Sequence, residues 1–167
     1  LAQEKNCGSN LRLNKYYKTN PEAKKIRSIL EKKITKFQIQ KEINTTIPVV
    51  VHVVYKNGNE NISNAQIQSQ LDVLNKDFTR TNTDAFNTPA DFLPFVSNTQ
   101  INFCLAQQSP KGNPTNGIIR KQTTTNSFPL FGDAIYYDSL GGSTAWNTQK
   151  YLNIWVAEIE IGILGWA

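Results

Sequence analysis

A run of β-branched and apolar residues, Ile47–Tyr55 (IPVVVHVVY), constrains the fold more than any other feature of this sequence. β-Branched side chains favour extended backbone, and a strand that is apolar on both faces has to be covered on both sides. Pro48 lies at the start of the run, where a missing amide donor does least harm. The run therefore predicts a buried strand inside a layered fold.

A helix is predicted over residues 64–79. Ser63 is a suitable N-cap, and Gln66 follows three residues later, as in a capping box. Ile62 and Ile67 are spaced to form a hydrophobic staple across the helix start. The buried stripe of the helix is expected to contain Ile67, Leu71, Leu74 and Phe78.

The sequence predicts four more strands, over residues 101–106, 118–125, 134–138 and 151–157. Within the first, Ile101, Phe103 and Leu105 point one way and Cys104 points the other. The order of strand, helix and further strands predicts an α/β (α+β) fold, in which a helix backs a twisted mixed sheet.

The positive charge is confined to the first quarter of the chain. Residues 1–42 hold 11 Lys/Arg and 4 Asp/Glu, a balance of +7, whereas the remaining 7 Lys/Arg and 9 Asp/Glu give −2. Such a shift marks a boundary. Residues 21–41 are predicted to form a basic amphipathic helix with an apolar stripe of Ile26, Leu30, Ile34 and Phe37.

A basic helix of this kind can bind nucleic acid or a membrane surface. The alternative is a helix with a solvated charged face that docks through its apolar stripe, and we favour it because a run of charges alone does not specify such a partner. The absence of aromatic residues among the basic ones also disfavours binding of single-stranded nucleic acid by stacking. No nucleic-acid partner is expected. No apolar run approaches the length of a membrane span, so no membrane-spanning segment is expected.

The residues able to carry chemistry are few. One His and two Cys cannot assemble a self-contained zinc site. His52 lies inside the valine run and is expected to be structural, with catalysis as the alternative. Two carboxylate pairs are expected to be solvated or explained by a sheet edge: Asp72 with Asp77, and Glu158 with Glu160. Cys7 precedes Gly8 and is either a free thiol or disulfide-bonded to Cys104.

Several segments taken together resemble the pappalysin family of zinc metalloendopeptidases, the ulilysin-like metzincins. They are Ile47–Tyr55 (IPVVVHVVY), Asn61–Asn82 (NISNAQIQSQLDVLNKDFTRTN), Ile101–Ala106 (INFCLA), Gly112–Arg120 (GNPTNGIIR) and Gly141–Ala167 (GGSTAWNTQKYLNIWVAEIEIGILGWA). They occur in the order and at the spacing typical of the family, and they cover residues 46–167.

The resemblance implies a metzincin-like upper subdomain over residues 46–167, incomplete because it lacks the active-site helix. That helix carries the HExxHxxGxxH zinc motif, which this sequence does not contain, and the methionine of the family's Met-turn is missing too. The zinc ligands would then lie beyond Ala167, and some members of the family also bind calcium. The last segment would form one wall of the substrate cleft, at Gly162, Ile163, Leu164, Gly165 and Trp166. This stretch alone is expected to lack peptidase activity.

The resemblance also gives residues 1–45 a role as a helical pro-segment of a secreted, latent precursor. In a cysteine-switch design, a Cys-Gly pair near the N-terminus places a thiolate on the catalytic zinc, and Cys7-Gly8 matches that pair. The expected partners are protein or peptide substrates and the remainder of the catalytic domain. The rival hypothesis is a non-catalytic secreted binding or adhesion module with the same sheet-and-helix layout.

Overall fold

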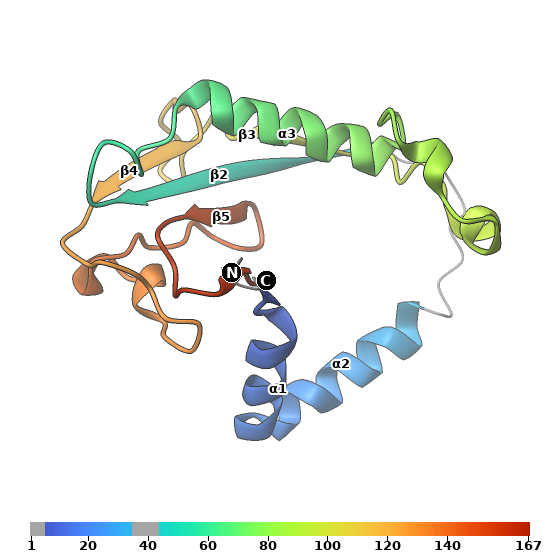
Figure 1. The fold of residues 1–167 in the computed structure, drawn as a ribbon, viewed down its shortest axis with the longest axis horizontal. Coiled ribbons are helices and arrows are strands. Elements are labelled where there is room, and N and C mark those ends of the chain that lie inside the picture. The colour runs from blue at the N-terminus through green and yellow to red at the C-terminus, as the bar shows by residue number, and fades with distance from the viewer. Residues whose placement is uncertain (1–5, 35–43) are drawn as a thin grey trace, which may run out of the picture.

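The structure, a computed structural model, describes residues 6–34 and 44–167. Its regular elements fall into a sheet with a covering helix, a pair of N-terminal helices and a short two-stranded ladder (Figure 1). The helices are α1 (Ser9–Thr19), α2 (Pro21–Ile34) and α3 (Asn64–Thr79). The strands are β1 (Asn6–Cys7), β2 (Thr45–Tyr55), β3 (Ile101–Leu105), β4 (Ile118–Gln122), β5 (Leu152–Val156) and β6 (Ile163–Gly165).

Strand β2 is the axis of the four-stranded sheet. Its residues 45–49 pair with β3 and its residues 51–55 pair with β4. Strand β5 pairs with residues 49–53, which overlap both of those stretches, so β5 takes the opposite edge of β2. The predicted α/β class is confirmed. Strand direction differs from the expectation of a mixed sheet, because these three pairings are all parallel.

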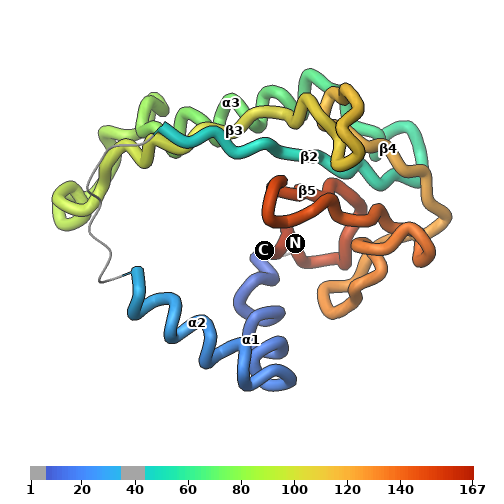
Figure 2. Tube along the Cα trace, turned by 180° about the vertical axis from the view of Figure 1, so that it is seen from behind, coloured from blue at the N-terminus to red at the C-terminus, as the bar shows by residue number. Residues whose placement is uncertain are grey.

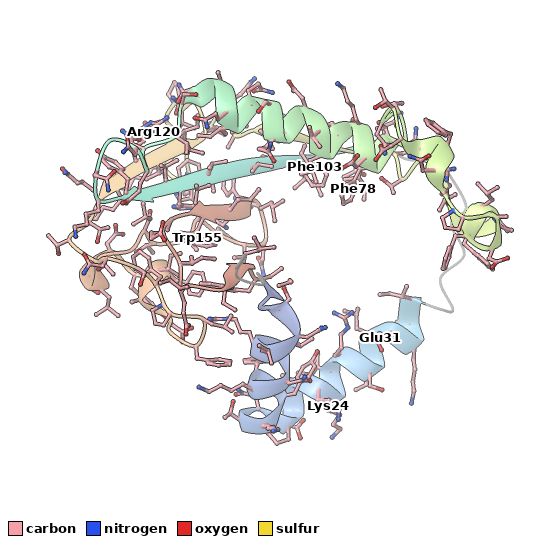
Figure 3. The ribbon with its side chains drawn as sticks, in the orientation of Figure 1. Lys24, Glu31, Phe78, Phe103, Arg120 and Trp155 are labelled. Atoms are coloured by element: carbon pink, nitrogen blue, oxygen red, sulfur yellow. The ribbon has the colours of Figure 1, made fainter. Side chains whose placement is uncertain are left out.

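Helix α3 covers one face of the sheet (Figure 1). It begins and ends where the sequence predicts, and the capping box between Ser63 and Gln66 is formed. Ile67 and Leu71 pack against the valines of β2 and against Phe103. Phe103 also meets Phe78 edge-on, with ring centroids 4.9 Å apart (Figure 3). The apolar stripe of α3 therefore closes one half of the core.

The opposite face of β2 is covered by the segment that leads to the C-terminus. Val54 packs there with Phe128 and Ile135, while the His52 ring stacks on Trp155 at 4.8 Å. Both faces of β2 are therefore buried, as its sequence requires. The strand predicted at 134–138 is wrong, because two 3-10 turns, Ala134–Tyr136 and Asp138–Leu140, occupy this region. These turns carry Ile135 under β2.

The N-terminal helices lie away from the sheet (Figure 1). The single helix predicted at 21–41 corresponds to α2, and its residues 35–41 lie outside the described range, whereas α1 was not predicted. The apolar stripe of α2 does not dock on the described part of the chain, because Ile26, Leu30 and Ile34 are 64%, 49% and 61% exposed. Within the described residues, no helix is both long and apolar enough for a membrane crossing.

Candidate functional site

The two segments that the sequence singles out for function lie against each other, although they come from opposite ends of the chain. Strand β1 pairs in parallel with β6, with Asn6 opposite Ile163 and Cys7 opposite Gly165. The ladder continues past Cys7, because the Gly8 amide donates to the Gly165 carbonyl at 2.7 Å. Figure 2 shows the start of α1 beside the C-terminal segment. Cys7 therefore lies on the predicted cleft wall.

Two glycines allow this ladder to form. Gly162 has a φ of +89°, in the left-handed region that glycine adopts without strain, and it turns the chain into β6. Gly8 is buried between the ladder and the segment behind it. A Cβ at position 8 would lie 2.4 Å from Leu130 Cδ1 and 3.3 Å from Ile163 Cγ2. The close approach of β1 to β6 therefore requires a residue without a side chain.

Cys7 presents an exposed thiol just before the N-terminus of α1. Its Sγ donates to Ser9 Oγ at 3.3 Å, and the same Oγ accepts from the Ala167 amide at 2.9 Å. Hydrogen bonding with the side chain and then the backbone of Ser9 lowers the pKa of the thiol. A helix N-terminus stabilises a thiolate as well. The disulfide with Cys104 is not formed, since both cysteines are free.

Arg12, on the first turns of α1, reaches across to the segment 130–136. Its guanidinium donates to the Leu130 carbonyl, to the Gly132 carbonyl at 3.2 Å and to Asp133 Oδ1 at 2.6 Å. The same group lies over the rings of Tyr136 and Trp166, 5.5 Å from each centroid. Arg12 thus ties the N-terminal segment to the body of the protein, and nothing in the sequence pattern predicts this contact.

The predicted cleft wall also borders a hollow. A cavity of about 680 Å³ lies between β5 and the C-terminal segment, and its lining includes Tyr136, Trp155, Leu164 and Trp166. Trp166 is held in place by its Nε1–H, which donates to the Tyr136 hydroxyl at 2.8 Å. Leu164 is 66% exposed. The edge at β6 therefore offers a mostly apolar surface next to an exposed thiol.

The donors of this chain do not fit a zinc centre. Over residues 6–34 and 44–167, no three His, Cys, Asp or Glu side chains are grouped to hold a metal ion. His52 is fully buried, and its Nδ1 and Nε2 lie 2.8 Å from Ser143 Oγ and 3.1 Å from Asn153 Oδ1. Burial lowers the pKa of this ring. His52 is therefore structural, as expected, and among the described residues Cys7 belongs to no group of three such side chains.

The carboxylate pairs do not form an acid–base site. Asp72 and Asp77 are exposed on α3, in agreement with the prediction. Glu158 and Glu160 are exposed as well, and Glu160 Oε2 accepts from the Leu130 amide at 2.9 Å. Glu160 thereby helps to hold the segment to which Arg12 binds.

Comparisons with known proteins agree with this picture. No family model and no curated protein matches the chain. Among solved structures, promirolysin from Tannerella forsythia, as its E225A mutant, matches with 44% identity and a TM-score of 0.78. That match covers 90% of this chain and 50% of the promirolysin chain.

Two further solved structures match a shorter part of the chain. Mature mirolysin from Tannerella forsythia in complex with a cleaved peptide has 51% identity and a TM-score of 0.66, covering 69% of this chain and 43% of its own. Mirolysin in complex with a compound has 50% identity and a TM-score of 0.68, covering 71% and 44%. The chain thus spans about half the length of these relatives, and over that part it is similar to mirolysin, a metzincin of the pappalysin/ulilysin family, in agreement with the resemblance noted in the sequence.

Proposed function

We propose that this chain is the front part of the latent precursor of a secreted zinc metalloendopeptidase. Residues 1–45 act as the pro-segment, and residues 46–167 form the upper part of the catalytic domain. The parent protein cleaves protein or peptide substrates. The observation that carries the proposal is the parallel ladder between β1 and β6, which lays the Cys7-Gly8 pair along the edge expected to bind substrate.

The extents of the structural matches support the division into pro-segment and catalytic part. Residues 46–167 are 167 − 45 = 122 residues, or 73% of the chain. The mature mirolysin structure covers 69% of the chain, whereas the promirolysin structure covers 90%. The additional coverage by the precursor is the result expected if the first 45 residues are removed on maturation.

The metal chemistry would come from outside this chain. When bound, zinc supplies a water of lowered pKa and polarises the scissile carbonyl. Strand β6 would align an extended peptide substrate along its edge. While β1 occupies that edge, the substrate would be excluded. Cys7 would block the metal, because a thiolate is a good zinc ligand and its pKa is already lowered.

The test compares two cysteine variants of the full-length precursor. Cys7→Ala is expected to show peptidase activity before the pro-segment is cut and to activate faster. Cys104→Ala is the matched control, since it removes the other exposed free thiol and is expected to leave latency unchanged. Unchanged latency and an unchanged activation rate in Cys7→Ala contradict the proposed role of the thiol.

A second measurement addresses the catalytic part. The purified 167-residue chain is expected to bind no stoichiometric zinc and to cleave no peptides, while the full-length protein does both. Zinc binding and peptide cleavage by this chain alone would contradict the proposal that the zinc ligands lie outside it. The rival hypothesis of a binding or adhesion module has less support, because the matched structures are metallopeptidases at 44% to 51% identity.

A further inference from the structure

The hydrogen-bond partners of His52 fix which of its ring nitrogens carries the hydrogen. Asn153 Oδ1 accepts from the Trp146 amide at 2.8 Å, and Asn153 Nδ2 donates to the carbonyls of Trp146 and Tyr151 at 3.0 and 3.3 Å. The side-chain amide is thereby oriented, so the Oδ1 atom that lies 3.1 Å from His52 Nε2 can only accept. Nε2 therefore carries the hydrogen, and Nδ1 accepts from the Ser143 hydroxyl at 2.8 Å.

The His52 ring begins a column of aromatic side chains that ends beside β6. It stacks on Trp155 with 12° between the two planes, and Trp155 meets Tyr136 edge-on at 4.9 Å. Tyr136 in turn accepts from Trp166 Nε1, in the residue that follows β6. Ser143 braces the column, because its carbonyl accepts from Trp155 Nε1 at 2.8 Å and its amide donates to the turn that carries Tyr136 at 2.9 Å.

A second proton on the ring, taken up from solvent, is incompatible with this arrangement. Nδ1 would become a donor, and the Ser143 hydroxyl would lose it as an acceptor. Ser143 is only 3% exposed, so its hydroxyl cannot simply turn toward bulk water. Since Ser143 also holds Trp155 and the turn of Tyr136, a change at its side chain acts on the whole column.

The charged groups around the ring come from two of the three elements packed against it. Strand β5 contains no charged residue. On β4, Arg120 is bonded to the Ile62 carbonyl before α3, and Lys121 pairs with Asp138 at 3.7 Å. Asp138, in the segment that carries Ser143, is the charged group that favours the imidazolium. Burial opposes it and is the larger effect, so the pKa of the ring is lowered.

We propose that His52 is a pH-sensitive positioning residue for the β6 edge. The neutral ring holds Trp155, and through it Tyr136 and Trp166, in place. A proton on Nδ1 displaces the Ser143 hydroxyl and loosens the column, so the β6 edge is firm near neutral pH and looser in acid. The functional consequence rests on the proposed peptidase function, because β6 is the edge proposed to bind substrate.

The test follows the 167-residue chain by NMR from about pH 7.5 to 5. At the upper end, the ¹⁵N shifts of His52 are expected to show the Nε2–H tautomer. On acidification, the Trp166 indole N–H signal is expected to shift with the same midpoint as the His52 ring. Asp138→Asn removes the charge that favours the imidazolium, so both midpoints should move to lower pH together. Asp77→Asn is the matched control, because it removes an exposed carboxylate on α3, and it should move neither midpoint.

His52→Gln keeps a donor and an acceptor but cannot take up a proton, so its Trp166 signal should not titrate. The proposal is overturned by an Nδ1–H tautomer at neutral pH, by a Trp166 signal that does not follow the His52 midpoint in Asp138→Asn, or by unfolding of the wild type before that signal moves. If His52→Gln does not fold, the wild type and the two aspartate variants decide the matter.

These readouts are independent of the peptidase proposal. They measure the ring and the column in this chain, so a negative titration leaves the proposed peptidase function untouched. Conversely, a failed latency test leaves a positive titration in place.

Discussion

The contact between Gly8 and Leu130 makes the docking of the N-terminal segment sensitive to a single methyl group. Gly8 has a φ of −80°, which alanine adopts without strain, so Gly8→Ala tests sterics alone. The new Cβ would lie 2.4 Å from Leu130 Cδ1, against an optimum of about 3.5–4.0 Å between carbon atoms. Leu130 is only 3% exposed, so its side chain cannot swing into solvent.

The magnitude follows from two opposing terms. Overpacking of a buried site costs about 1–3 kcal/mol. The loss of glycine's freedom in the undocked chain offsets about 0.4–1 kcal/mol of that cost. With the middle of each range, about 2 kcal/mol against about 0.7 kcal/mol, the net destabilisation of the docked state is about 1.3 kcal/mol, which raises the undocked population roughly tenfold.

Hydrogen exchange measures this change directly. The Ala167 amide donates to Ser9 Oγ across the docked segment and is chemically identical in all variants, so it reports opening. We expect its protection to fall roughly tenfold in Gly8→Ala. Gly58→Ala is the matched control, because no atom lies within 4 Å of its new Cβ, and it should leave protection unchanged. A protection factor in Gly8→Ala within about twofold of wild type would refute the steric reasoning.

Three further predictions concern the body of the protein. Burial lowers the pKa of His52 in the folded protein below the ordinary value of about 6.5. As the pH falls through about 6.5, the imidazole therefore binds a proton in the unfolded chain but not yet in the folded one, and this favours unfolding. The free energy of unfolding, measured in urea, should decrease from pH 7.5 to 5.5, and His52→Gln should flatten that slope. Asn75→Ala removes both side-chain bonds to the Phe103 backbone, at 2.7 and 2.9 Å, and should cost about 1–3 kcal/mol by urea titration. Gly142→Ala places a Cβ 2.3 Å from two backbone oxygens of the 134–136 turn, so its melting temperature should fall further than that of Gly8→Ala. An unchanged midpoint in either of the last two variants would contradict the corresponding contact.

The elements that the sequence predicts well are those whose signals are local. Strand β2 follows from its β-branched residues, and α3 follows from its cap at Ser63 and from the spacing of Ile67 and Leu71. In both cases the pattern that identifies the element is also the pattern that buries it, because the same side chains form the core.

The elements that were missed depend on partners distant in the sequence. Strands β1 and β6 have two and three residues, too few for a period of two to be visible, and each exists because it pairs with the other. Residues 134–138 have the composition of a strand, yet the need to bury Ile135 beneath β2 bends them into turns. Cys7 and Gly162–Trp166 were identified through family resemblance, whereas the acceptors of Arg12 are mostly backbone atoms, which leave no trace in side-chain patterns.

The central position of β2 has a consequence for biosynthesis. Its partners β3, β4 and β5 all follow it in the chain, and the last of them ends 156 − 55 = 101 residues later. At about 5–20 residues per second, a nascent chain would hold the valine-rich strand without its full set of neighbours for roughly 5–20 s. A β-branched, uncharged segment left unpaired for that long is prone to aggregate, so the cell's holding chaperones are expected to act on residues 45–55.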